Sequence, residues 1–150
     1  MKPLREWLSL SARDRGLLLR AALLLGGIRV GLWLLSFATL RRLLARLGQP
    51  AGRGVDREQV FVERVAWAVG VAGRHVPWDC TCLPRALAAQ VLLARGGCPA
   101  RLRIGVARNA ARQLQAHAWV ESRGNVVVGN LEDLARYVPL PLDGAANGRG

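Results

Sequence analysis

Residues 78–90 read WDCTCLPRALAAQ, and this stretch combines two cysteines with the beginning of an expected helix. Pro84 lacks the backbone N–H that a helix interior needs, so it fits only in a first turn. The helix is therefore expected to begin at Thr81 or Cys82. Apolar residues continue at helical spacing as far as Gly96-Gly97, where the helix should end. The stretch thus predicts that Cys82 lies at the N-terminus of a helix.

A thiol in that position has the chemistry of a nucleophile. Unpaired backbone N–H groups and the positive end of the helix dipole both favour the thiolate form of Cys82. Cys80 lies before the helix and lacks these neighbours. Three cysteines are an odd number without the spacing of a disulfide framework, which indicates a reducing cytoplasm. Zinc binding by Cys80 and Cys82 with His75 or His117 is disfavoured, because one intervening residue is a poor match to zinc-ligand spacing.

The composition indicates a single folded domain with a basic N-terminal part. The chain has 150 residues, 51% of them hydrophobic, and a net charge of +12. Residues 1–48 hold nine Lys and Arg against Glu6 and Asp14, so this part could meet an acidic partner or a membrane face. An arginine-rich solvated surface is the alternative. Nucleic-acid binding is disfavoured, because aromatic residues make up only 5% and do not interleave with the basic ones.

Residues 1–47 are expected to be helical, with one break at Gly26-Gly27. Within the apolar segment from Leu17 to Leu40, Arg20 and Arg29 leave uncharged runs of only 8 and 11 residues. A membrane-spanning helix needs about 20 apolar residues, so a helical hairpin packed on the domain or on a partner is predicted. Peripheral membrane contact is the alternative.

The remainder of the chain predicts one more helix and a sheet. A loop at Gly48–Gly54 should separate the lead from a helix that starts at Asp56 and ends near Gly73. After Gly97 the hydrophobic period changes from helical to two. Strands are expected over residues 101–106, 113–121 and 126–129. Consecutive strands with short turns form an antiparallel sheet, so the predicted fold class is α+β.

The expected hairpin places a histidine opposite an asparagine. If Glu121 pairs with Val126, then His117 lies directly opposite Asn130, close enough for the two side chains to hydrogen-bond. Cys82, His117 and Asn130 would then supply the nucleophile, the base and the orienting group of a thiol-dependent peptidase or acyl transferase. The alternative from the residues alone is that Cys82 and His117 are ordinary packing residues.

Four blocks of sequence resemble a known family. They are CLPRALA at 82–88, PARLRIGV at 99–106, AHAWVE at 116–121 and RYVPL at 136–140. In this order they are similar to the transglutaminase-like leader peptidases of lasso-peptide biosynthesis, over residues 55–142. The resemblance implies a transglutaminase-like, papain-like core after a helical lead at 1–48, and a flexible tail at 143–150.

The resemblance also implies an activity. Members of this family remove the leader from a ribosomally made precursor peptide, with Cys82 as the expected nucleophile and His117 as the base. The family places an aspartate near the end of the strand that follows the histidine, where this chain has Gly129-Asn130 with Asp133 nearby. Asn130 and Asp133 therefore both stay candidates for the third position. No cofactor of the peptidase itself is implied.

The expected partners follow from the same resemblance. Residues 1–48 are too short and too helical for the leader-binding module of fused members, so the chain is similar to the split form. It should act with a separate leader-recognition protein and an asparagine-synthetase-like cyclase that uses ATP. The basic lead is a candidate docking surface for either protein or for a membrane. A non-catalytic adaptor with the same fold is the alternative function.

Overall fold

In the computed structural model, residues 2–47, 58–75 and 82–140 are described, and within them helices precede a small sheet. The helices are α1 (Lys2–Ser9), α2 (Ala12–Leu34), α3 (Phe37–Leu47), α4 (Glu58–His75) and α5 (Cys82–Arg95). The sheet consists of β1 (Arg101–Arg108), β2 (Leu114–Ser122), β3 (Asn125–Val128) and β4 (Val138–Pro139), with the short 3₁₀ helix η1 (Leu134–Arg136) before β4. The predicted α+β class is confirmed.

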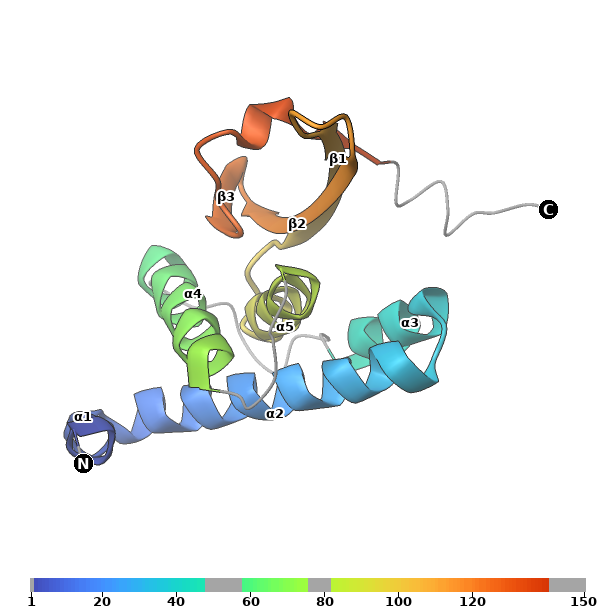
Figure 1. The fold of residues 1–150 in the computed structure, drawn as a ribbon. Coiled ribbons are helices and arrows are strands. Elements are labelled where there is room, and N and C mark those ends of the chain that lie inside the picture. The colour runs from blue at the N-terminus through green and yellow to red at the C-terminus, as the bar shows by residue number, and fades with distance from the viewer. Residues whose placement is uncertain (1, 48–57, 76–81, 141–150) are drawn as a thin grey trace.

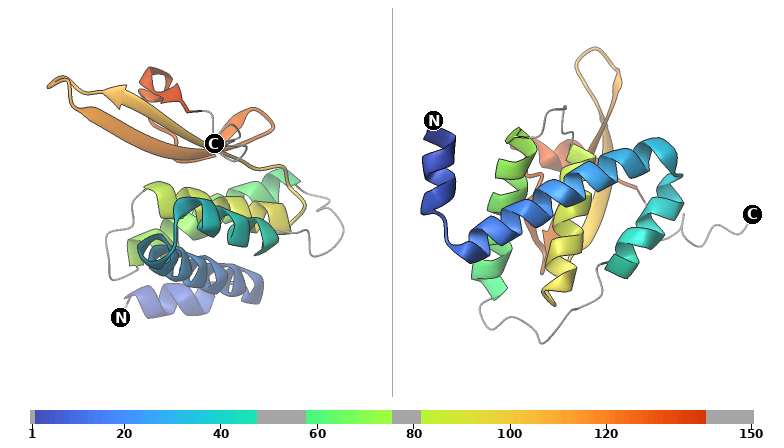
Figure 2. Two further views of the ribbon diagram at one scale, coloured as in Figure 1. Left: turned by 90° about the vertical axis from the view of Figure 1, so that its right-hand side faces the viewer. Right: turned by 90° about the horizontal axis from the view of Figure 1, so that it is seen from below.

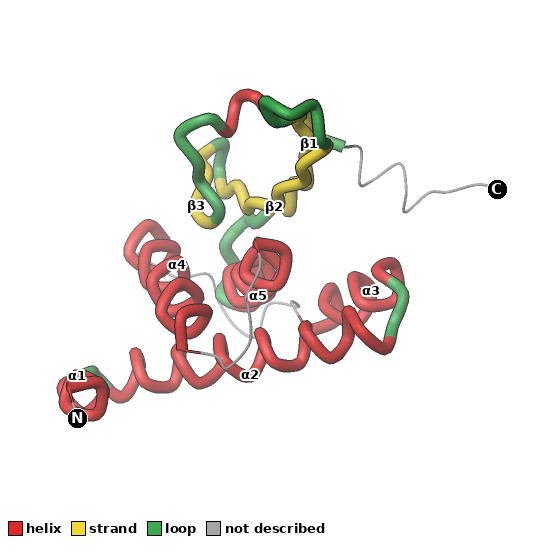
Figure 3. Tube along the Cα trace, in the orientation of Figure 1, coloured by secondary structure: helices red, strands yellow, loops and turns green. Residues whose placement is uncertain are grey.

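The elements form layers around α5. The strongly curved sheet, in the order β3-β2-β1-β4, covers one side of α5, and α4 lies beside α5 (Figure 1). On the other side, α2 crosses both α4 and α5, and α3 folds back along α5. The side view in Figure 2 shows the sheet and α2 at opposite ends of this stack. The secondary-structure colouring in Figure 3 shows that the connection from β3 to η1 closes over the concave side of the sheet.

One hydrophobic core joins the N-terminal helices to the sheet. It contains Leu18, Leu25 and Ile28 of α2 together with Leu87 and Leu93 of α5. From the sheet it includes Leu102, Ala118 and Val120. The helical lead therefore packs on the domain, as predicted. The expected loop at Gly48–Gly54, the N-cap Asp56 and the tail 143–150 lie outside the described residues.

The expected break at Gly26-Gly27 is wrong, because α2 runs without interruption from Ala12 to Leu34. Each glycine costs a helix interior only about 1 kcal/mol, and burial of the α2 side chains against α4 and α5 outweighs that cost. The chain turns instead at Leu35-Ser36, where the Ser36 hydroxyl accepts the Thr39 N–H at 3.3 Å. By length and composition alone, α2 is apolar enough to cross a membrane.

An ion pair ties the start of α2 to α4. The Asp14 carboxylate accepts hydrogen bonds from the Ser11 hydroxyl and from the Arg64 guanidinium. The Ser11 hydroxyl in turn caps the helix by accepting the Asp14 N–H at 3.1 Å. These bonds, with that from Ser11 the larger influence, hold the pKa of Asp14 below its usual range.

A carboxylate with a lowered pKa stabilises the fold only while it is ionised. The contribution of Asp14 is therefore fully present above about pH 4 and is lost as the pH falls through the folded-state pKa. We expect Asp14→Asn to lower the free energy of unfolding at neutral pH but to match the wild type in acid. Urea unfolding at both pH values checks this. In an Arg64→Gln background the difference at neutral pH should shrink, and an undiminished difference would contradict the pairing.

Candidate active site

Cys82 is the first residue of α5, as the position of Pro84 predicts. Its thiol is free and partly buried, and Pro84 is buried in the first turn behind it. The backbone N–H groups at a helix start have no intrahelical partners, so the Cys82 side chain lies beside such donors and the positive end of the helix dipole. Gly97, with φ 78°, ends the helix: its N–H donates to Ala94 and that of Cys98 donates to Leu93.

Arg85 is a residue near Cys82 that the sequence did not single out. It lies three positions further along α5, so its side chain leaves the helix on the same side as the thiol. It packs on Gly73 of α4, where a Cβ would come within 2.6 Å of the Arg85 Nε. Among the described residues this buried Nε has no hydrogen-bond partner. The Arg85 guanidinium adds a positive charge about one turn from Cys82.

His117 of β2 is held by a main-chain oxygen. Its Nε2 lies 2.6 Å from the carbonyl oxygen of Gly129. A carbonyl can only accept, so Nε2 carries the hydrogen, and the neutral ring keeps Nδ1 as its basic nitrogen. The ring also lies against Trp119, with centroids 6.1 Å apart, and against Tyr137, at 5.6 Å. The Gly129 carbonyl and the two aromatic rings therefore fix the orientation of the imidazole.

Two hydrogen bonds to the Glu121 carboxylate hold the Trp119 ring in place. The Trp119 Nε1 donates to Glu121 at 3.0 Å, and the Arg103 Nε donates to the other Glu121 oxygen at 3.4 Å. Gly105 of β1 lies under the ring, since a Cβ there would come within 2.8 Å of Trp119. The sequence indicates part of this arrangement, because His117, Trp119 and Glu121 alternate along a strand and therefore share one face of it. Tyr137 comes from the segment before β4, which periodicity did not predict.

The predicted strand register is only partly correct. The turn at Arg123-Gly124, with positive φ at both residues, pairs Glu121 with Val126 as expected. Beyond that pair the register shifts, and Val120 lies opposite Val128. This bulge adds one residue to β3, and the strand ends at Val128. The predicted pairing of His117 with Asn130 is therefore wrong, and Gly129 occupies the space beside the histidine.

Neither candidate for the third position binds His117 within the described residues. Asn130 is exposed after the end of β3. Asp133 is exposed as well, and its carboxylate pairs with Arg136 at 2.8 Å. The Gly129 carbonyl does what was expected of Asn130, since it accepts the hydrogen of His117 Nε2.

The structure places Cys82 and His117 on elements that pack together but leaves their side chains apart. Ala118 and Val120 turn toward α5 and belong to the core, so the alternating His117 and Trp119 turn to the concave face of the sheet. No hydrogen bond joins the Cys82 thiol to His117 or to any other described side chain. A reaction between the two groups requires that they approach.

The structure describes two of the other predicted candidates, His75 and Cys98. His75 is the last residue of α4 rather than part of a turn, and its Nδ1 lies 2.8 Å from the Val71 carbonyl oxygen. Cys98 is buried after α5, and Cys80 lies outside the described residues. In the described ranges, no group of three or more His, Cys, Asp or Glu side chains is arranged to hold a metal ion.

Comparison with known proteins gives one match. Residues 22–141 match the family described as the transglutaminase-like superfamily. The matched region begins inside α2 and so includes part of the N-terminal helices as well as Cys82 and His117. No curated protein and no solved structure matches the chain.

Proposed function

Because the chain belongs to the transglutaminase-like superfamily, we propose that it is a cysteine peptidase that removes the leader from a ribosomally made lasso-peptide precursor. The observation that carries the proposal is the position of Cys82, the first residue of the helix on which the sheet packs. A superfamily that includes cysteine peptidases supports the reaction class. The four sequence blocks at 82–88, 99–106, 116–121 and 136–140 support the choice of substrate.

In the proposed reaction, His117 Nδ1 takes the proton of the Cys82 thiol and the thiolate attacks the scissile carbonyl. The Cys82 backbone N–H, at the helix start, donates to the oxyanion. The imidazolium then protonates the leaving amine, which departs with the core peptide, and the leader remains as a thioester. Water activated by His117 hydrolyses the thioester and restores the thiol. Throughout these steps the Gly129 carbonyl accepts the Nε2 hydrogen of His117.

This reaction needs a closure that substrate binding would supply. The Cys82 thiol and His117 Nδ1 must come within hydrogen-bond distance, whereas the structure leaves them unbonded. Catalytic hydrogen bonds that are open in a free enzyme often tighten only in the complex with substrate. Tyr137 and Trp119, which hold the imidazole from two sides, are the contacts that would have to adjust.

We propose that the enzyme acts in the cytoplasm with a separate leader-recognition protein. Helices α2 and α3 contribute side chains to the common core, so they do not form a leader-binding module of their own. An ATP-dependent, asparagine-synthetase-like cyclase would close the ring on the released core peptide. The ATP is thus used by the partner, and Cys82 and His117 need no cofactor.

A second candidate function has one observation in its favour. The His117 ring lies on the concave face of the sheet, away from α5, and makes no hydrogen bond to the Cys82 thiol. This arrangement suits a non-catalytic adaptor, which would keep the transglutaminase-like fold and bind a peptide, a protein or a membrane surface without using the thiol.

Alkylation kinetics separate the two functions. In a Cys80→Ala, Cys98→Ala protein, Cys82 is the single thiol, so iodoacetamide uptake reports its reactivity alone. If substrate binding brings His117 to the thiol, the rate near neutral pH, measured with the precursor and the leader-recognition protein present, should fall about tenfold in a matched His117→Gln variant. At alkaline pH, where any cysteine ionises, the two rates should converge. Equal rates at both pH values would favour the adaptor.

A further inference from the structure

The helix α2 is apolar on two opposite sides, only one of which is covered. One side packs on α4 and α5 through Leu18, Ala21, Leu25 and Ile28. The opposite side, here called the outer face, carries Leu19, Leu23, Val30, Trp33 and Leu34. All five are exposed, with Trp33 at 85% and Leu23 at 75%. Five large exposed apolar side chains on one face of a helix form a contiguous patch, and such patches are typical of interaction surfaces.

Cations border the outer face and anions are missing from it. At 100° per residue, the exposed Arg20 and Arg29 fall on its two opposite edges. The single acidic residue of α2, Asp14, lies on the inner side and binds Ser11 and Arg64. An apolar strip with arginines on both edges has the charge pattern of a helix that lies in an anionic membrane interface.

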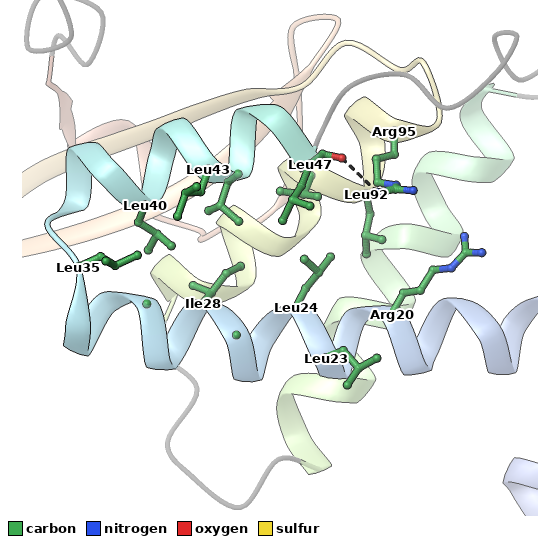
Figure 4. Close-up of a pocket in the computed structure, with 14 residues that line it drawn as sticks. Arg20, Leu23, Leu24, Ile28, Leu35, Leu40, Leu43, Leu47, Leu92 and Arg95 are labelled. Atoms are coloured by element: carbon green, nitrogen blue, oxygen red, sulfur yellow. Dashed lines mark hydrogen bonds between the residues drawn. The ribbon is translucent and has the colours of Figure 1, made fainter.

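A groove extends the apolar surface toward α3. It has a volume of about 480 Å³ and lies between α2, α3 and α5 (Figure 4). Leu23 belongs both to the groove and to the outer face, and exposed leucines of the α3 region, Leu35, Leu43 and Leu47, line the groove's other side. Figure 4 shows Arg20 and Arg95 together at one end. The groove is lined mainly by leucines and has two arginines at one end (Figure 4), which suits acyl chains and anionic headgroups.

We propose that the outer face and this groove dock on an anionic lipid bilayer, with α2 lying flat in the interface. Trp33 then sits at headgroup level, where indole rings are favoured. A spanning orientation is disfavoured, because it would pull the buried side of α2 out of the core and place Arg20 and Arg29 in hydrocarbon. In the docked orientation the sheet with His117 faces away from the bilayer, since α4 and α5 lie between (Figure 2).

Vesicle co-sedimentation of the purified full chain tests this docking. Vesicles that contain phosphatidylglycerol should bind the protein, those of phosphatidylcholine alone should bind it weakly, and high salt should release it. Val30→Asp should weaken binding about tenfold or more. A carboxylate would replace an apolar group that the bilayer covers, and it would repel the anionic headgroups. Leu114→Asp is the matched control, since Leu114 is equally apolar and 69% exposed but lies on the sheet. It should bind as the wild type does.

Trp33 reports the orientation directly. Vesicles should shift the tryptophan emission to shorter wavelength, and Trp33→Phe should reduce that shift, because the Trp33 indole lies on the outer face and is 85% exposed, against 38% for Trp67 and 3% for Trp119. Cys82→Ala should bind vesicles normally, so docking is tested apart from catalysis. Failure of the wild type to bind anionic vesicles would overturn the proposal, as would equal loss in Val30→Asp and Leu114→Asp. Binding that resists high salt and alkaline extraction would show a spanning helix instead.

Discussion

Replacing Cys82 by alanine should abolish cleavage of the precursor peptide, by about 10⁴-fold or more in rate, because loss of a nucleophile removes the covalent step altogether. The assay contains the precursor and the leader-recognition protein, and mass spectrometry measures the released leader. Circular dichroism checks the fold of the variant, which should be intact, since the Cys82 side chain is only partly buried.

The other cysteines supply matched controls for this result. Cys98→Ala removes a thiol that is 4% exposed and lies after the C-terminal end of α5, so cleavage should persist at a modest cost in stability. Cys80→Ala should also retain cleavage, because the helix-start position belongs to Cys82. Persistent cleavage by Cys82→Ala would exclude the proposed mechanism. Loss in all three variants would indicate damage to the fold rather than to the reaction.

Replacing Gly129 by alanine should damage both the fold and the setting of His117. Gly129 has φ 86°, a left-handed conformation that costs other residues about 1–2 kcal/mol. A Cβ there would also lie 2.7 Å from the Ala118 carbonyl oxygen and 3.0 Å from Trp119, and neither is a flexible chain end. We therefore expect a loss of about 2 kcal/mol or more in the free energy of unfolding, measured in urea. Cleavage should fall as well, because the Gly129 carbonyl that orients His117 must move.

Gly124 is the matched control for that variant. It has nearly the same φ, 82°, but nothing lies within 4 Å of the position of its Cβ. Gly124→Ala should thus show the backbone cost alone, about 1 kcal/mol, and leave cleavage near the wild-type rate. If the two glycine variants behave alike, the close approach of Gly129 to β2 does not matter for the site.

The third position of the site can be assigned by the same assay. If the Gly129 carbonyl orients His117, then Asn130→Ala and Asp133→Ala, both at exposed positions, should keep most of the cleavage activity. A strong loss in one of them would show that its side chain replaces the carbonyl when substrate binds, and the role assigned to Gly129 would then be wrong.

Much of this fold follows from local features of the sequence. Pro84 fits only in a first turn, which predicts a start at Thr81 or Cys82, and α5 begins at Cys82. Gly97 suits the left-handed position that ends the helix. The period of two in residues 101–121 and the Arg123-Gly124 turn predict the hairpin and its first pair. Such features can be predicted from sequence because they depend on backbone preferences and on which face of an element is apolar.

Other features exist only in the folded molecule. The glycines at 26 and 27 do not break α2, because packing on α4 and α5 decides where that helix ends. The bulge after Glu121 depends on how β3 closes against β2, and it replaces the expected Asn130 by a main-chain oxygen that no side-chain pattern reveals. The sequence alone determined Cys82 at a helix start and His117 on a strand. Tertiary packing decided which atom holds His117 and which face of the sheet it occupies, because both depend on contacts between segments distant along the chain.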